Sequence, residues 1–214
     1  MTRKSHKVYK FVNHSKTVQI IAKKYGWFTG ARYTNLRDVK TFMTLGFLDI
    51  DWKDYDFNWH KEVAMIHNPL VTVAKDIVRS NEVDRILKQA EELKKYCKYV
   101  VIVPKSKKIG PELKQIIPND YILGYSVKTR YGGTEIPIEF FKERKVHLLG
   151  GRPERQRLIG DVLDVFSVDC NRFTLDARYG DYFDGEIFRP HPIGGYVNCI
   201  KDSIKNINKL WSYY

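Results

Sequence analysis

The stretch that decides the fold is Val146-His147-Leu148-Leu149-Gly150-Gly151-Arg152-Pro153, followed later by Val165-Phe166-Ser167-Val168-Asp169. Each half starts as a short apolar run of the kind found in buried parallel strands. Pro153 favours the first turn of a helix between the two runs, because its fixed φ suits that position. The second run ends on Asp169, and α/β barrels carry their functional side chains at that end of a strand. The stretch therefore predicts two strand-then-helix units with a carboxylate at the functional edge of the sheet.

The same alternation of strand and helix recurs along the whole chain. Short apolar runs predict strands at 8–12, 27–33, 47–50, 70–74, 99–103, 121–127, 146–149 and 165–168. Helical spacing with start and stop signals predicts helices at 16–25, 35–45, 55–66, 81–97, 111–116 and 138–143, another from residue 153, and a last one over 197–211. Eight such units predict an α/β fold of the compact (β/α)8 TIM-barrel type, as a single domain over 1–214. An open doubly wound sheet with fewer strands is the alternative.

Net charge, cysteine spacing and the length of apolar runs limit the kinds of partner and the location that we expect for this protein. The chain carries 37 Lys and Arg against 25 Asp and Glu, and the resulting net charge of +12 favours a polyanionic partner. A basic surface that serves solubility alone is the other interpretation. Cys97, Cys170 and Cys199 are far apart, so we expect no disulfide framework, no metal site and no cofactor. Because no apolar run is long enough for a membrane span and no signal peptide opens the chain, we expect a cytoplasmic protein without membrane contact.

Polar residues follow the predicted strands, and in a barrel they converge on one rim. They are Asn13, His14, Arg32, Tyr33, Asp49, Asp51, Lys75, Asp76, Lys105, Ser126, Lys128, Gly150, Gly151, Asp169 and Asn171. Carboxylates suit nucleophilic or acid–base work, and cations suit phosphate groups. A single Asp at such a place is also a common helix cap or turn residue. The mixture on one rim predicts chemistry on a nucleotide.

Three blocks in order resemble the catalytic core of the queuine/guanine tRNA transglycosylases and of their smaller phage relatives, which exchange guanine in DNA for 7-deazaguanines. The blocks are Gly124–Val127, His147–Pro153 and Asp169–Gly180. By this resemblance, Asp169 is the nucleophile that attacks C1′ of the target nucleoside and holds the sugar covalently. Asp49, or alternatively Asp51, would accept and donate the proton of the base.

The resemblance also implies how the substrate is held. Asp76 would read the amino and ring N–H groups of the base, and the backbone of Gly124 and Ser126 would contact its edge. Tyr125, Gly150, Gly151 and Asn171 complete the expected substrate-binding set, and the expected nucleic-acid contacts are Arg172, Arg178, Lys105 and Lys128. The segment 171–176 departs from the family pattern.

The absence of the family's Cys/His zinc subdomain points to the compact phage-type enzymes. We therefore expect DNA and a 7-deazaguanine base as partners, and the host cytoplasm as the location if the protein is phage-encoded. A tRNA-guanine transglycosylase, a non-catalytic nucleic-acid-binding subunit of a modification complex and a base hydrolase are the alternatives. A homodimer is left open.

The expected chemistry is consistent without the family. An N-glycosidic bond breaks through an oxocarbenium-like transition state that a carboxylate can trap covalently, and a second carboxyl must handle the proton of the base. A flipped base needs aromatic walls, for which Tyr125, Phe173 and Tyr33 are the candidates. His147 is interpreted as a core or loop-bracing histidine rather than as a ligand.

Overall fold

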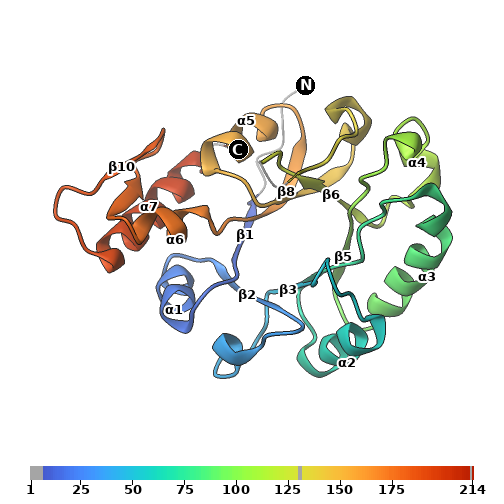
Figure 1. Ribbon diagram of the computed structural model, residues 1–214, viewed down its shortest axis with the longest axis horizontal. Helices are drawn as coiled ribbons and strands as arrows, with labels where there is room; N and C mark the ends of the chain where they lie inside the picture. The colour runs from blue at the N-terminus through green and yellow to red at the C-terminus, as the bar shows by residue number, and fades with distance from the viewer. Residues whose placement is uncertain (1–6, 130–131, 213) are drawn as a thin grey trace.

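In a computed structural model, which describes residues 7–129, 132–212 and 214, parallel strands close into an eight-membered barrel (Figure 1). The strands are β1 Tyr9–Val12, β2 Phe28–Arg32, β3 Phe47–Asp49, β4 Val71–Val73, β5 Tyr99–Ile102, β6 Ile122–Ser126, β7 Lys145–Leu149 and β8 Asp164–Asp169. Each pairs with its neighbours in sequence, and β1 pairs with β8 through Tyr9 and Ser167 to complete the ring. The predicted TIM-barrel fold is confirmed.

Helices follow most of the strands. They are α1 Lys16–Lys24, α2 Phe57–His67, α3 Val83–Leu93, α4 Leu113–Ile116, α5 Pro153–Gly160, α6 Arg172–Ala177 and α7 Tyr196–Leu210. In α3 the apolar stripe of Val83, Ile86, Ala90 and Leu93 is buried, as its helical spacing predicts. No helix in the described part of the chain has the length and apolar character needed to cross a bilayer.

Two predicted helices are wrong, because only single 3-10 turns form there. Segment 35–45 contains η1 Arg37–Val39, and the Asp38 side chain of this turn accepts a hydrogen bond from the Lys16 backbone of α1. Segment 138–143 contains η4 Ile138–Phe141, which ends before Glu143 adopts a φ of 67°. Further 3-10 turns are η2 Ser80–Glu82 and η3 Lys107–Ile109. In segment 35–45 this contact with α1 overrides a weak helical pattern.

The segment after β8 forms a small lobe beside the barrel, of which the sequence predicted only the last helix (Figure 1). α6 leads into the antiparallel hairpin of β9 Asp181–Phe183 and β10 Phe188–Pro190, and α7 follows. The hairpin is fastened to α7, because the Phe183 backbone N–H donates to Ser203 Oγ at 2.9 Å. α7 in turn is fastened to the barrel, since Trp27 Nε1 donates to Asn208 Oδ1 at 2.8 Å.

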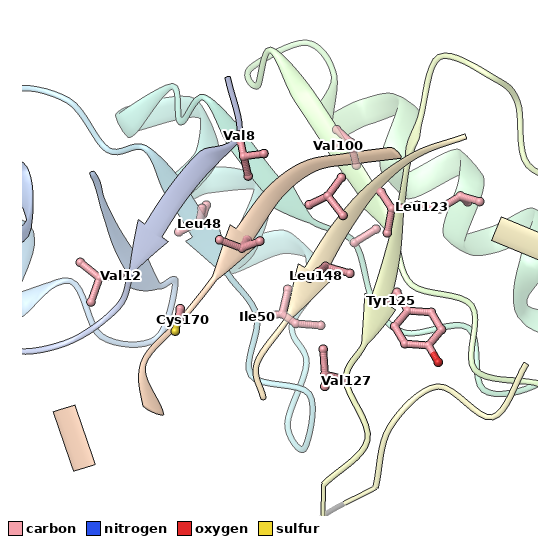
Figure 2. Packing of buried hydrophobic residues seen from close by; sticks show 14 of the residues in the cluster. Val8, Val12, Leu48, Ile50, Val100, Leu123, Tyr125, Val127, Leu148 and Cys170 are labelled. Atoms are coloured by element: carbon pink, nitrogen blue, oxygen red, sulfur yellow. The ribbon is translucent and has the colours of Figure 1, made fainter. Parts of the chain in front are cut away.

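Alternate strand residues divide into an inner and an outer core. The inner core fills the barrel with Phe11, Phe47, Val71, Val73, Val101, Val103, Ile122 and Phe166. The outer core lies between strands and helices, where Leu123, Tyr125 and Leu148 point away from the barrel axis (Figure 2). His147 is fully buried in the interior, 5.1 Å from the Phe47 ring, with Nδ1 2.7 Å from Ser167 Oγ. Its interpretation as a core histidine is confirmed.

Candidate active site

Two carboxylates meet at the mouth of the barrel, as the strand ends predicted. Asp169 is the last residue of β8 and Asp49 is the last residue of β3. Both line a cavity of about 570 Å³ on the β1, β2 and β8 side, and both also line a cavity of about 300 Å³ on the β4 to β7 side. Arg32, at the end of β2, is the third residue common to the two cavities. Asp49 and Asp169, which we call the carboxyl pair, therefore stand where the two cavities join.

The orientation of Asp169 is set by a chain of hydrogen bonds. The Asn13 backbone N–H donates to Asn171 Oδ1 at 2.9 Å, so the amide nitrogen of Asn171 must face the other way. That nitrogen donates to Asp169 Oδ1 at 3.0 Å. Gln156 Nε2 holds the backbone, donating to the Asp169 carbonyl at 2.9 Å and to the Gly150 carbonyl at 2.8 Å. Within the described residues Asp169 has no ion pair, and its Oδ2 receives no hydrogen bond.

Burial makes the carboxyl pair hard to ionise. Asp169 is 8% exposed, and burial, followed by repulsion from Asp49, raises its pKa to about 8. The Asn171 hydrogen bond and the Arg32 charge oppose this shift. Burial likewise raises the pKa of Asp49 to about 6, against a hydrogen bond from the Ile50 N–H. Near neutral pH Asp49 is therefore mainly ionised, while Asp169 mainly keeps its proton.

The smaller cavity combines an apolar floor with a polar wall. Val73, Val103 and Leu149 line it together with Ser126 and Gly151. Gly151 has a φ of 86°, and a Cβ at that position would lie 2.6 Å from a Val127 methyl, so only glycine fits. The Thr134 hydroxyl accepts a hydrogen bond from the Ser126 N–H at 2.9 Å and holds the loop after β6 against the cavity.

Charged and aromatic groups complete the smaller cavity. Asp76 forms an ion pair with Lys105 at 2.8 Å, and burial nevertheless raises the pKa of Asp76 above its ordinary value. Trp52, 62% exposed, lines the cavity as well. Lys105, Asp76, Ser126, Gly150 and Gly151 thus lie together, as predicted.

The larger cavity is more polar and more basic. Asn13 and His14 line it from the loop after β1, Arg37 from the loop after β2, and Arg178 from the end of α6. Burial lowers the pKa of His14, and the charge of Arg178 lowers it further. The cavity thus offers uncharged donors and arginines beside the carboxyl pair.

The predicted aromatic walls are wrong. The Tyr125 ring points out of the barrel and packs edge-on against Phe141 at 5.1 Å (Figure 2). Phe173 packs against Trp27, and Tyr33 stacks on His60, so none of the three candidates lines either cavity. Among the described lining residues, Trp52 is the single aromatic one. A large aromatic within the charged loop Asp51-Trp52-Lys53-Asp54 was the signal that could have found it.

Gly124 is also misplaced in the prediction. It lies one layer below the floor of the smaller cavity and lines neither cavity. A Cβ there would lie 2.6 Å from a Val103 methyl and 3.0 Å from a Leu149 methyl. The glycine therefore allows close packing inside the barrel rather than access of the backbone to a ligand.

Three other predicted residues lie at the periphery. Asp51 lines neither cavity, and its Oδ1 accepts a hydrogen bond from the Lys53 N–H at 3.2 Å. Arg172 is bound to Asp176 by two hydrogen bonds of 2.7 and 2.8 Å and also lines neither cavity. Lys128 borders a separate depression of about 280 Å³ that the Gly132-Gly133 turn also lines. The nucleic-acid roles of Arg172 and Lys128 stay predictions.

The described residues offer no grouping of three His, Cys, Asp or Glu side chains suited to a metal ion. The three cysteines are buried and unpaired.

Comparison with known proteins complements this geometry. A search of curated proteins found no match. Residues 22–212 match a family of unknown function, DUF6610, a span that runs from α1 to the end of α7. Strands β2 to β8, the hairpin lobe and the carboxyl pair fall inside this span, whereas β1 and four residues that line the larger cavity, Asn13, His14, Ser15 and Gln19, precede it. The chain is therefore a member of the DUF6610 family.

Proposed function

We propose that this protein is a base-exchange transglycosylase that replaces guanine in DNA with a 7-deazaguanine. The observation that carries the proposal is the placement of Asp169. Its carboxyl group faces both cavities, is oriented by Asn171, and has no ion-pair partner within the described residues. A buried carboxyl group without a neutralising partner is costly to keep, and such groups cluster at functional sites.

The reaction follows from the two carboxyl groups. Asp169 Oδ2 attacks C1′ of the target deoxynucleotide, the bond from C1′ to the base nitrogen breaks, and its electron pair stays on the base. Asp49 donates the proton that neutralises the departing guanine. In the second half, the Asp49 carboxylate takes the N–H proton of the incoming base. The base nitrogen then attacks C1′ and releases Asp169.

The two cavities divide the substrate. The smaller one suits a planar base, because Val73, Val103 and Leu149 supply an apolar floor and Trp52 a stacking face. Asp76 accepts hydrogen bonds from the amino and ring N–H groups of a guanine-like base, and Lys105 balances the negative charge of Asp76. The larger cavity, with its arginines and neutral amides, suits the sugar and the flanking phosphates.

Several features favour DNA over the alternatives. The net charge of +12 matches a polyanion, and the Cys/His pattern with which the tRNA enzymes help to bind tRNA does not occur in these 214 residues. A chain that only binds nucleic acid would have no need of two buried carboxyl groups at the junction of the cavities.

A labelled-base experiment tests the proposal. The protein is incubated separately with duplex DNA and with tRNA, each in the presence of labelled guanine or a labelled 7-deazaguanine. We expect label in the DNA. Label in tRNA alone would identify the tRNA enzyme, and release of guanine without incorporation would identify the hydrolase. If neither release of guanine nor incorporation of label is observed, the result contradicts catalysis altogether.

A further inference from the structure

Positive charge is concentrated on one side of the barrel. The described residues 7–45 hold eight Lys or Arg and one acidic residue, Asp38, so they carry seven of the twelve net positive charges. Within the described part, this segment forms β1, α1, β2 and the loop 33–46. These elements are neighbours in the barrel and lie on the side of the larger cavity (Figure 1).

Exposed cations surround the larger cavity on this side. Arg32 and Arg37 line it, and Lys16 and Lys40 each follow a lining residue in the sequence. All four residues are exposed. Among the described residues, only Arg37 of the four has an ion-pair partner, Asp38 at 3.0 Å. The other three positive charges are therefore free to attract an anion.

The loop 33–46 is held against α1, so these cations keep a fixed arrangement. The Lys16 backbone N–H donates to Asp38 Oδ1 at 3.2 Å near the start of α1. Further along, Lys23 Nζ lies 5.5 Å from the centre of the Phe42 ring. Lys23 and Lys24 continue the row of cations along α1, leading away from the mouth of the barrel.

The α3 and α4 side differs, although it also carries lysines. There, Lys94 pairs with Asp120, Lys95 with Glu92 at 3.0 Å, and Lys114 with Glu143 at 2.6 Å. The charges of these three lysines are balanced locally, whereas Lys16, Arg32 and Lys40 have no ion-pair partner among the described residues.

We infer that the DNA strand on either side of the target nucleotide runs along this basic face. The α1 surface, as we name it, consists of Lys16, Lys23, Lys24, Arg32, Arg37 and Lys40. Phosphate contacts of this kind supply most of the sequence-independent affinity of a protein for DNA, because each releases a counterion. The inference rests on the proposed function, since it places the strand so that its target nucleotide enters the larger cavity and reaches the carboxyl pair.

Salt-dependent DNA binding tests the α1 surface. One variant carries Lys16→Gln, Lys23→Gln and Lys40→Gln. A control with the same loss of charge carries Lys88→Gln, Lys98→Gln and Lys142→Gln, three exposed lysines elsewhere on the molecule. Binding of a fluorescent single-stranded DNA of about 16 nucleotides is followed by anisotropy over a range of NaCl concentrations. For each lost phosphate contact, the slope of log K against log salt should shrink by about 0.7 on a single strand.

We expect the α1 variant to lose about 2 from this slope and the control to lose none. Equal slopes for the two variants, an unchanged slope in the α1 variant, or no DNA binding by the wild type would overturn the inference. Asp169→Asn should bind as the wild type does, because binding does not need the nucleophile. Failure of base exchange with a reduced slope in the α1 variant would instead reject the proposed reaction and leave the docking surface standing.

Discussion

Replacing Asp49 by Asn should simplify the pH dependence of base exchange and reveal which carboxyl group must be ionised. In the wild type, pKa values of about 6 for Asp49 and about 8 for Asp169 predict a bell-shaped profile with its maximum near pH 7. The mechanism needs Asp169 ionised while Asp49 is protonated, the reverse of their order of titration. A gap of about two pKa units leaves about 1% of the protein in that state at the maximum.

In Asp49→Asn one titration disappears from the profile. Exchange should fall by about 100-fold to 10,000-fold, the usual loss for a proton-transfer group. The residual rate should rise with pH through a single pKa below 8, because repulsion from Asp49 is one of the causes that raise the pKa of Asp169. The assay is incorporation of labelled guanine into DNA between about pH 5 and 9.

Asp51→Asn is the matched control, because Asp51 is a carboxylate two residues after Asp49 but lines neither cavity. It should keep both limbs of the profile and most of the rate. A residual rate in Asp49→Asn that falls as pH rises would refute the assignment, because it would make Asp169 the acid. Loss of a limb in Asp51→Asn would transfer the proton role to Asp51.

Further predictions concern stability and positioning. The pKa of Asp169 is higher in the folded chain than its ordinary 3.8, so folding takes up a proton between about pH 4 and 8 and wild-type stability declines as pH rises through this window. We therefore expect the free energy of unfolding of Asp169→Asn to exceed that of the wild type by at least about 1 kcal/mol at pH 9, and by less at pH 5. Urea unfolding measures both values, and free energies that change in parallel with pH in the two proteins would contradict the prediction. Asn171→Ala removes a hydrogen bond that lowers the pKa of Asp169, so the fall of the exchange rate at high pH should move to higher pH. The value of kcat should fall about tenfold. An unchanged pH profile would show that the hydrogen bond is dispensable. Gly124→Ala should cost about 1–3 kcal/mol of stability by overpacking against Val103, whereas a neutral effect would mean that the inner core is loose.

Much of the fold was predictable because buried parallel strands have a simple signature. β7 and β8 begin within one residue of the apolar runs 146–149 and 165–168. The hairpin of β9 and β10 was not predictable in this way. Its strands are three residues each and only partly buried, so they leave no long apolar run.

The site was predictable in position more than in detail. Chain direction in a barrel brings every strand end to one rim, and this placed Asp49, Asp76 and Asp169 correctly. Neighbouring residues on a strand face opposite sides, however, and this is why Ser126 lines a cavity while Tyr125 does not. The directions of Arg32 and Trp52 depend on tertiary contacts, which spacing along the chain does not contain.

The most direct test of the account looks for the sugar on the protein. Wild-type protein and Asp169→Asn are mixed with guanine-containing DNA, quenched in denaturant, and examined for a covalent protein–DNA adduct by denaturing electrophoresis and peptide mass spectrometry. The account predicts an adduct on the peptide that contains Asp169, and neither adduct nor exchange in the variant. Base exchange that continues in Asp169→Asn, or an adduct on another residue, would contradict it.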